Sequence, residues 1–533
     1  MKRLFSLLLL LSFPLGAASE QLGILTPPPG KEPRINGPKV LALRPQHEML
    51  WRVPVTGEAP LTLSVKGLPE GLTFDPEKRL LGGTAARGEY ALTFTAENQF
   101  GKSEQIVKVK VGDKLALTPP MGWNSWNCFA GKVTGEDIKN AADALISSGL
   151  ADHGWNYINI DDFWQNRPRE KEDETLMGPE RAADGTILSN KRFPSMKELA
   201  DYIHSKGLRA GLYSSPGPLT CGGCVGSWGH EWQDAKTYAD WGFDYLKYDW
   251  CSYNRIAMGD EALEKYYLPY RLMGEALFHQ NRDIVFSLCE AGYPNVSNWG
   301  PLVYSACWRT TSDISGSFNS MARILKAQEG LWRFASPGAW NDPDMLIVGV
   351  IGWGDPKPTK LTPNEQYTHV SLWAMLCAPL LIGCDLTKLD DFTLSLLTND
   401  EIIEVNQDEL GAQAAKISAS EEGEIWAKPM SDGSLVFALY NSSKEGEETK
   451  TLALDFEKLG LLGEWRVRDL WRQKELGICR ERYTASVPCH ATQVVRLFPV
   501  GEANLKPELK DIRDLATYNF FRVNRNLNKP GLE

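Results

Sequence analysis

Short apolar runs, separated by Gly, Pro and Asn, fill the segment between residues 40 and 111. The runs LTLSVKG, YALTFTAE and QIVKVKV alternate apolar and polar positions or are rich in β-branched residues. A period of two residues is typical of strands that bury one face, and the breaks between these runs contain residues that favour turns. The pattern therefore predicts a small β-sandwich over residues 36–112.

From residue 113 the period changes, and short apolar runs alternate with amphipathic stretches such as DIKNAADALISSGL and SMKELADYIHSKG. Alternation of this kind predicts a parallel sheet whose strands are joined by crossover helices. Eight strand candidates occur up to residue 408: ALTPPMGW, NYINIDDFW, RAGLYSS, FDYLKYDW, DIVFSLCE, VYSACWRTTSD, GAWNDPDML and PLLIGCDL. Eight such units predict a (β/α)8 TIM barrel over residues 113–408.

Beyond residue 408 the helical period ends. Runs such as GEIWAKPM, GSLVFALYN and TQVVRLFP predict an antiparallel β domain over residues 409–500, followed by a polar tail over residues 501–533. At the other end, residues 1–18 carry Lys2 and Arg3, a largely apolar run and three small residues, which predicts a cleaved signal peptide. The expected location is the periplasm or the outside of the cell. No later apolar stretch reaches the ~20 residues that a membrane helix requires.

Composition narrows the possible partners. The 533 residues have a net charge of −11 and no dense run of Lys and Arg, which argues against binding of nucleic acid. The 18 Trp and 17 Tyr supply flat rings that suit the faces of sugars, although most Trp in proteins serve packing. The sequence has no GxSxG elbow, phosphate-binding Gly-Lys loop or dinucleotide fingerprint. No cofactor is expected.

Acidic residues end most of the predicted barrel strands. In a TIM barrel the active site forms at the carboxyl ends of the strands, so these side chains are expected to converge on one mouth. Like charges at close range raise one another's pKa, as catalysis requires when one carboxyl must stay protonated beside an ionised partner. The set, with two basic residues that compensate the charge, is Asp161, Asp162, Lys247, Asp249, Glu290, Arg309, Asp313, Asp342 and Asp344.

Two other interpretations of these residues are open. An acidic residue at the end of a strand often caps the next helix, although seven on one rim are too many for that role alone. Metal binding is the second interpretation. The seven His form neither an HxH nor an HExxH pair, which argues against zinc, whereas a calcium or magnesium site made of carboxylates alone stays open. We expect a site without metal.

Five motifs, in order along the barrel, carry a family resemblance. TPPMGWNSW (118–126), NIDDFW (159–164), DYLKYDWC (244–251), WRTTSDI (308–314) and WNDPDML (340–346) resemble the strand-end motifs of α-galactosidases in glycoside hydrolase family 27. The stretch LPEGLTFDPEKRLLGG (68–83) resembles the immunoglobulin-like module of many bacterial exported enzymes. The expected fold is thus α/β, with a (β/α)8 catalytic barrel between an N-terminal Ig-like β-sandwich and a C-terminal antiparallel β-sandwich.

The resemblance implies a retaining exo-hydrolase of terminal α-linked D-galactose that uses double displacement. Asp249 would attack the anomeric carbon, and Asp313 would protonate the leaving oxygen and then activate water. Lys247, two positions before Asp249, falls on the same strand face and would help to keep the nucleophile ionised while it holds a sugar hydroxyl. The substrate would be an α-galactoside oligosaccharide or glycan.

Further residues are assigned by the same resemblance. Asp161 and Asp162 would hold the 6- and 4-hydroxyls, and Trp123 would pack against the apolar face of galactose. Glu290 would crowd the 2-position and favour a free hydroxyl over an N-acetyl group. The remaining lining residues and a bracing disulfide are Tyr213, Arg309, Asp344, Met345 and the pair Cys221 and Cys251.

Two departures from the family pattern concern loops. Ala291 follows Glu290 where plant-like members carry Trp, which leaves the preference for the leaving sugar open. Phe163 replaces a Cys of many members, so Cys128 is expected to be a free thiol.

Alternatives of substrate and of class also stay open. Within the family they are an α-N-acetylgalactosaminidase and a β-L-arabinopyranosidase. A non-catalytic carbohydrate-binding protein is the alternative of another class, against which the presence of both Asp249 and Asp313 argues. The N-terminal module is expected to be a spacer rather than a sugar-binding unit, because its sequence has no evident cluster of exposed aromatic residues. The sequence does not determine the oligomeric state, for which a homodimer is one option.

Overall fold

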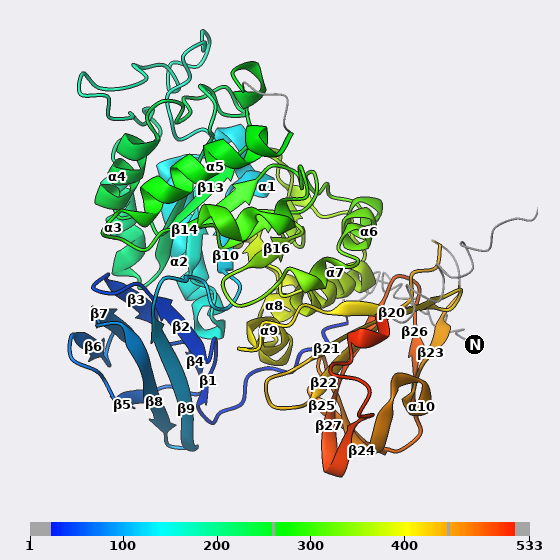
Figure 1. Ribbon diagram of the computed structural model, residues 1–533. Helices are drawn as coiled ribbons and strands as arrows, with labels where there is room; N and C mark the ends of the chain where they lie inside the picture. Colours follow the sequence, from blue (N-terminus) through cyan, green and yellow to red (C-terminus); the bar gives the residue numbers. More distant parts are fainter. Residues whose placement is uncertain (1–22, 258–261, 445–447, 517–533) are drawn as a thin grey trace, which may run out of the picture.

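The protein is described by a computed structural model covering residues 23–257, 262–444 and 448–516, which form three domains (Figure 1). The N-terminal β-sandwich, blue in the figure, lies at one end of a central barrel, and the C-terminal β domain, orange and red, lies beside the barrel. The predicted signal peptide, residues 1–18, falls outside the described residues. Within these ranges no helix is both long and apolar enough to cross a membrane.

The N-terminal domain consists of two main sheets with the strand orders β2-β9-β8-β5 and β3-β7-β6, and of the separate pair β1-β4. Strand β8 illustrates the alternation seen in the sequence, because Leu92, Phe94 and Ala96 are completely buried between more exposed neighbours. The strands are β1 (Arg34–Ile35), β2 (Val40–Leu43), β3 (Met49–Arg52), β4 (Val55–Thr56), β5 (Thr62–Lys66), β6 (Leu72–Asp75), β7 (Leu80–Gly83), β8 (Gly88–Asn98) and β9 (Gly101–Val111).

Eight parallel strands form the barrel in the order β19-β10-β11-β12-β13-β14-β15-β16. A bridge between Leu346, shortly after β16, and Ile382 of β19 closes the ring. Seven of the eight strand candidates contain one of these strands, and the first overlaps β10 except at Asn124, so the predicted barrel is confirmed. The strands are β10 (Met121–Asn124), β11 (Tyr157–Asn159), β12 (Arg209–Ser214), β13 (Tyr245–Asp249), β14 (Val285–Cys289), β15 (Cys307–Arg309), β16 (Trp340–Asp342) and β19 (Leu380–Ile382).

Helices surround the barrel, and several begin at side chains that cap them. Thr134 and Thr362 form capping boxes with Asp137 and Glu365, which satisfy N–H groups that the first helical turn leaves free. A short pair, β17 (Val350–Ile351) and β18 (Lys357–Pro358), lies between β16 and α7 in the chain. The helices are α1 (Trp126–Phe129), α2 (Gly135–Ser147), α3 (Met196–Ser205), α4 (Glu231–Trp241), α5 (Ala262–Phe278), α6 (Phe318–Ala327), α7 (Pro363–Met375), α8 (Asp391–Leu397) and α9 (Asp400–Gln407).

The inside of the barrel changes character along its axis. Near the amino-terminal ends of the strands, Tyr157, Tyr245 and Trp340 belong to an apolar cluster that closes the base. Further along β13, the side chains of Lys247 and Asp249 lie on the same face as Tyr245, because side chains alternate along a strand. A polar mouth is thus built on an apolar base.

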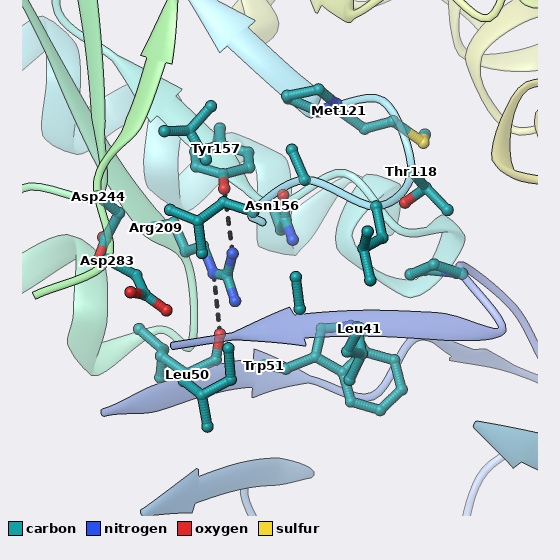
Figure 2. A pocket seen from close by; sticks show the side chains of 18 of the residues that line it. Leu41, Leu50, Trp51, Thr118, Met121, Asn156, Tyr157, Arg209, Asp244 and Asp283 are labelled. Carbon is teal, nitrogen blue, oxygen red and sulfur yellow. Dashed lines mark hydrogen bonds between the residues drawn. The ribbon is translucent and has the colours of Figure 1, made fainter. Parts of the chain in front are cut away.

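The N-terminal domain is attached directly to this base. Arg44 pairs with Asp283 at 2.7 Å and donates to the carbonyl of Arg282 at 2.6 Å, in the segment between α5 and β14. Arg209, the first residue of β12, donates to the carbonyl of Leu50 at 3.0 Å beside a small cavity between the domains (Figure 2). Buried polar contacts therefore fix the N-terminal domain on the barrel, unlike a spacer on a free linker.

The C-terminal domain has a six-stranded antiparallel sheet, β20-β21-β22-β27-β24-β25, and the pair β23-β26. Strand β27 continues to Leu505, past the predicted domain limit at residue 500, and Ile512 is buried in the core of this domain. The described part of the predicted tail therefore packs on the domain. The elements are β20 (Ala415–Ser420), β21 (Gly423–Pro429), β22 (Leu435–Tyr440), β23 (Lys450–Asp455), α10 (Phe456–Leu459), β24 (Leu461–Asp469), β25 (Lys474–Cys479), β26 (Arg482–Val487) and β27 (Thr492–Leu505).

Candidate active site

Four neighbouring strand ends bring together the first group of predicted site residues. Lys247 and Asp249 lie on one face of β13, and Tyr213 of β12 is in register with Lys247. The ammonium group of Lys247 donates to Asp161 at 2.8 Å, and the Tyr213 hydroxyl donates to Asp249 at 3.0 Å. Asn124, at the end of β10, also donates to Asp161, at 2.9 Å. Two carboxylates and a cation therefore meet at one mouth.

A second group is centred on Arg309, at the end of β15. Its buried guanidinium group pairs with Asp344 at 2.8 Å and with Asp313 at 3.0 Å. Asp344 also accepts the backbone N–H of Ile314 at 2.7 Å and that of Met345 at 2.9 Å. The Asp313 side chain is 77% exposed. Arg309 therefore anchors one oxygen of Asp313 while the rest of the carboxyl group is open to a ligand.

The pKa values of the two candidate catalytic carboxyls are shifted in opposite directions. Burial raises the pKa of Asp249; Lys247 opposes this shift and Asp313 reinforces it. Burial acts in the same direction on Asp313, but the positive charges of Arg309 and Lys247 outweigh it and leave the pKa of Asp313 below its ordinary value. This order is the reverse of the one expected from the assigned roles, because the positive charges of Arg309 and Lys247 outweigh burial at Asp313, whereas burial prevails at Asp249.

Asp162 is held by the backbone rather than by a cation. Its carboxylate accepts the N–H of Phe163 at 2.8 Å and the N–H of Gly222 at 2.7 Å. Burial raises the pKa of Asp162 to about 6. Phe163 has a φ of 80°, which is uncommon for a residue other than glycine. A strained backbone persists only where surrounding contacts hold it. The hydrogen bonds of the Asp162 carboxylate lie directly beside Phe163 and provide such contacts.

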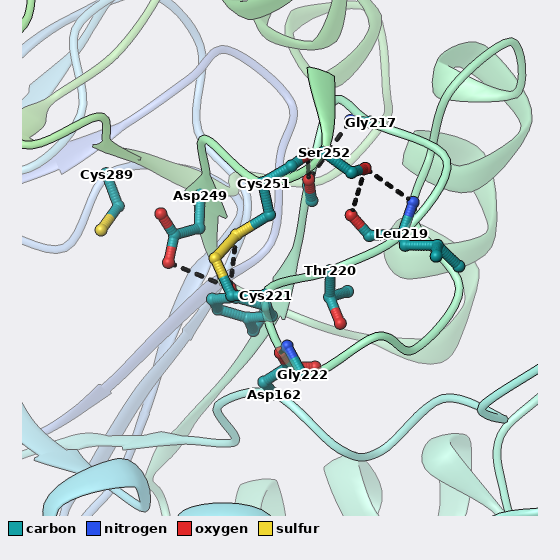
Figure 3. The surroundings of a disulfide bond; sticks show 12 residues. Asp162, Gly217, Leu219, Thr220, Cys221, Gly222, Asp249, Cys251, Ser252 and Cys289 are labelled. Carbon is teal, nitrogen blue, oxygen red and sulfur yellow. Dashed lines mark hydrogen bonds between the residues drawn. A yellow bond between two sulfur atoms is a disulfide. The ribbon is translucent and has the colours of Figure 1, made fainter. Parts of the chain in front are cut away.

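Cys221 and Cys251 form a disulfide, as the family resemblance implies (Figure 3). It joins the segment after β12 to the position two residues beyond Asp249, and the Sγ atom of Cys251 lies 3.5 Å from the Tyr213 hydroxyl. Both sulfurs also belong, with Asp249, to a cluster of three potential metal-ligand atoms among the described residues. Since the two sulfurs are bonded to each other, they offer no thiolate to a metal. Cys128 is a free, buried thiol.

Glu290, directly after β14, is buried, and the Gly292 N–H and the charge of Arg309 do not offset this burial. It is 3% exposed, and neither carboxylate oxygen has a hydrogen-bond partner in the described part of the chain. Burial raises its pKa well above the ordinary value. An unpaired buried polar group is unfavourable for folding, so such a position is a candidate for ligand binding.

Family models match all three domains. Residues 118–408 match the model described as Alpha galactosidase A, residues 420–497 match the alpha galactosidase C-terminal beta sandwich domain, and residues 49–112 match an Ig domain model. The chain belongs to the alpha-galactosidase A family.

Relatives and solved structures agree with this family assignment. The alpha-galactosidase of Cyamopsis tetragonoloba is 41% identical over 389 residues, which are 72% of this chain and 87% of the relative. Alpha-galactosidase A of Cellvibrio japonicus is 38% identical over 413 residues, covering 73% and 93% of the two chains. The structure of alpha-galactosidase I from Mortierella vinacea aligns with a TM-score of 0.64 at 32% identity, covering 73% of this chain and 98% of that one.

A structure from Bacteroides fragilis NCTC 9343 aligns over a larger share of this alpha-galactosidase family member than the Mortierella vinacea structure does. Its TM-score is 0.80 at 35% identity, and the alignment covers 89% of this chain and 99% of the other. The match therefore extends beyond the barrel and the C-terminal domain into the N-terminal one.

One sugar contact predicted for this alpha-galactosidase family member is wrong. Trp123 is completely buried, and its indole N–H donates to the carbonyl of Cys384 at 2.7 Å. The reason is the alternation along β10, where Asn124 points into the barrel mouth towards Asp161 and its neighbour therefore points outwards. Trp123 packs against Phe129 in the core outside the strands and cannot reach a sugar.

Trp126 was missed by the sequence reasoning, although it belongs to the same motif. It is half-buried at the start of α1 and stacks on Phe163, with ring centroids 6.4 Å apart. Phe163 directly follows Asp162, so the Trp126 ring lies near the carboxylates after β11. Strand alternation could have excluded Trp123, but only the fold shows that Trp126 is near these carboxylates.

The other predicted residues surround one mouth. The contacts described above connect them either directly or through the strand ends that carry them. These residues are Asp161, Asp162, Tyr213, Lys247, Asp249, Glu290, Arg309, Asp313, Asp344, Met345 and the disulfide Cys221–Cys251.

Proposed function

We propose that this protein is a retaining exo-α-galactosidase that releases terminal α-linked D-galactose from oligosaccharides or glycans. The observation that carries the proposal is the pair Asp249 and Asp313 at one mouth. The charge of Lys247 acts on both, the Tyr213 hydroxyl donates to the first and Arg309 donates to the second. Two carboxyl groups that act on one pyranose are what double displacement requires. The alpha-galactosidases among the relatives support galactose as the sugar.

The proposed reaction has two steps. Asp249 attacks the anomeric carbon while Asp313 gives a proton to the leaving oxygen, which forms a β-linked galactosyl-enzyme. Asp313 then takes a proton from water, and the oxygen attacks the same carbon from the side that the leaving group vacated, so the α configuration is restored. Lys247 offsets the charge of Asp249, and Tyr213 holds one of its oxygens.

Substrate binding has to reverse the order of the two pKa values. A bound sugar would shield Asp313 from water, and loss of hydration raises the pKa of a carboxyl group. Positive charge that develops at the anomeric carbon would in turn favour the ionised form of Asp249. The protonation that the first step needs would therefore arise in the complex rather than in the free protein.

Selectivity for galactose is proposed from Glu290, Asp161 and Asp162. An N-acetyl group at the 2-position would meet Glu290, and L-arabinopyranose lacks the 6-hydroxymethyl group, so one of the two hydroxyls that Asp161 and Asp162 would hold is absent from it. Among aryl glycosides of α-D-galactose, α-N-acetylgalactosamine and β-L-arabinopyranose, kcat/KM should be highest for the galactoside by about tenfold or more. Faster cleavage of either other glycoside would change the substrate assigned to this site.

An exported location is part of the proposal. It is supported by the sequence of residues 1–18 and by the disulfide Cys221–Cys251, since disulfides persist in oxidising compartments. The protein would then act in the periplasm or outside the cell.

Azide rescue tests the roles of the two carboxyls. In Asp249→Ala, azide should attack an aryl α-galactoside from the side of the missing nucleophile and give the β-galactosyl azide. In Asp313→Ala, azide should replace water in the second step and give the α-galactosyl azide. The opposite anomers, or wild-type rates without azide, would contradict the assignment. Galactose binding by the wild type without turnover of any glycoside would favour a non-catalytic carbohydrate-binding protein.

A further inference from the structure

A separate cleft lies beside the disulfide. Its volume is about 760 Å³, and it is lined by residues between 167 and 172, by residues between 219 and 223 and by residues 250–252. The two sulfurs, of Cys221 and Cys251, lie within 4.8 Å of a carboxylate oxygen of Asp249. Figure 3 shows this arrangement, with Thr220 and Ser252 beside the disulfide. The cleft therefore adjoins the place where a substrate would react with Asp249.

One wall of the cleft carries more positive than negative charge. Arg167 pairs with Glu170 at 2.5 Å, and three successive backbone N–H groups also bind the Glu170 carboxylate and fix the turn. Arg169 and Lys171 are exposed and have no ion-pair partner in the described part of the chain. Glu172 is the remaining acidic residue of this wall, so the wall has two unpaired positive charges and one negative charge. The protein as a whole has a net charge of −11.

Another part of the cleft lining offers an aromatic ring. Trp250 directly follows Asp249 and is half-buried. It packs among Tyr253, Tyr266 and Tyr270, with ring centroids 5.0, 4.3 and 6.1 Å away, and the part of the ring that they leave open lines the cleft. Its indole N–H donates to Asn254 at 3.1 Å, which fixes the orientation of the ring. Indole rings pack against the apolar faces of sugars, and Arg and Lys bind carboxylates and sulfate esters. The two parts of the lining together are complementary to a sugar that carries a negative charge.

We propose that this cleft binds the sugar next to the cleaved galactose, and that it favours a sugar with a carboxylate or a sulfate ester. The inference rests on the proposed function, because in an exo-galactosidase the part of the substrate outside the galactose pocket is the leaving glycan. Arg169 and Lys171 pair with the anionic group, and Trp250 packs against the ring. Neutral leaving sugars enter the same cleft without the ion pairs.

The test uses one charge-reversal variant and one matched control. Arg169→Glu/Lys171→Glu changes the cleft, whereas Lys326→Glu/Lys474→Glu makes the same change in net charge at exposed lysines outside it. Four substrates are compared: an aryl α-galactoside and three α-galactosyl disaccharides whose second sugar is galactose, galacturonic acid or galactose 6-sulfate. Because ion pairs at a surface are screened by salt, kcat/KM is measured at low ionic strength and at about 1 M salt.

At low ionic strength the wild type should cleave an anionic disaccharide with a kcat/KM about fivefold or more above that of the neutral one. The cleft variant should lose this preference, while its activity on the aryl and neutral substrates stays within about twofold and the control variant keeps the preference. High salt should reduce the preference of the wild type. A preference for only the uronate or only the sulfate identifies the group that is bound.

Two results would overturn the inference: a wild type that does not distinguish anionic from neutral disaccharides, or equal losses in the cleft and control variants. If the wild type cleaves no α-galactoside at all, the proposed function fails instead. Calorimetric titration with galactose 6-sulfate and with galacturonic acid then decides separately whether the cleft binds anionic sugars. Loss of that binding in the cleft variant alone would support it, and no binding to the wild type would exclude it.

Discussion

Strand β13 has a carboxylate at each end, and their surroundings differ. Asp244, directly before the strand, pairs with His204 at 2.8 Å and with Arg282 at 2.6 Å. Burial acts to raise its pKa, but these partners outweigh burial and leave the pKa lowered. Asp249, the last residue of the strand, is bonded by the Tyr213 hydroxyl, and its pKa is raised. The same strand therefore carries a well-paired carboxylate at the base and a less well-paired one at the mouth.

The contrast holds for the two ends of the barrel in general. At the base, the buried guanidinium group of Arg44 is paired with Asp283, and apolar side chains fill the interior. At the mouth, Glu290 is buried, and neither of its carboxylate oxygens has a hydrogen-bond partner among the residues that the structure describes. Paired groups contribute stability, whereas unpaired ones reduce it and are typical of sites that bind or react. Substitutions at the base should therefore change stability first, and substitutions at the mouth should change activity first.

The largest effect is expected for Asp249→Asn. Loss of the nucleophile should lower kcat on an aryl α-galactoside about 10,000-fold, or ~5.5 kcal/mol in activation free energy. Because burial disfavours the ionised carboxylate, the Tm should not fall. Steady-state kinetics and thermal unfolding check both parts. Substantial residual activity in a variant of lower Tm would place Asp249 among the structural residues instead.

Asp244→Asn should have the opposite profile. It leaves Arg282 without its carboxylate partner, and breaking a buried ion pair costs about 3–5 kcal/mol of stability. A lowered pKa stabilises the fold above the ordinary pKa of Asp, about 3.9, and this contribution is lost as the pH falls through the lowered value. Urea unfolding should therefore show a large deficit at neutral pH that narrows below about pH 4. The kcat of the folded variant should stay near the wild-type value, and a loss comparable to that of Asp249→Asn would refute the contrast.

The sequence was sufficient for the barrel because its signals are local. Apolar runs with turn residues between them marked each strand, and an acidic residue such as Asp249 or Asp344 at a strand end belongs at the mouth of any TIM barrel. Side-chain direction within a strand was also available, since Asn124 and Trp123 must face opposite sides. The error at Trp123 came from giving the motif more weight than this alternation.

Other features depend on contacts between distant segments. The pKa of Asp313 depends on Arg309, which is near in sequence, but also on burial and on the charge of Lys247 from a distant strand, which only the fold brings close. The missing partners of Glu290 are visible only when every neighbouring element is in place. Likewise, the docking of the N-terminal domain depends on Arg44 meeting Asp283, a residue 239 positions away in the chain.

The two tryptophans of the first barrel motif allow a sharper test of this contrast, in which one substitution should change stability first and the other activity first. Trp123→Ala removes a completely buried ring and should cost about 3 kcal/mol of stability through the cavity it leaves. Trp126→Ala removes a half-buried ring beside Phe163 and should lower kcat/KM about tenfold, or ~1.4 kcal/mol, with a smaller change in Tm. Steady-state kinetics and thermal unfolding of both variants show whether each substitution affects mainly stability or mainly activity. If Trp123→Ala impaired catalysis without destabilising the fold, the packing described for it would be incorrect.

The smallest and most specific effect is expected for Glu290→Gln. A carboxyl group whose pKa is raised on folding stabilises the protein below its ordinary pKa, about 4.3, and this contribution is lost as the pH rises through the raised value. Gln keeps the shape of the neutral form and carries no charge, so the variant should be more stable than the wild type by about 1–2 kcal/mol at pH 8 and by little at pH 4. Activity should fall, because the group lost is the proposed partner of the 2-hydroxyl. Thermal unfolding at both pH values measures the difference in stability between the variant and the wild type. For Asp244→Asn this difference has the opposite sign. A difference that does not grow with pH would mean that Glu290 has a partner in solution, and the contrast between base and mouth would then no longer extend to this residue.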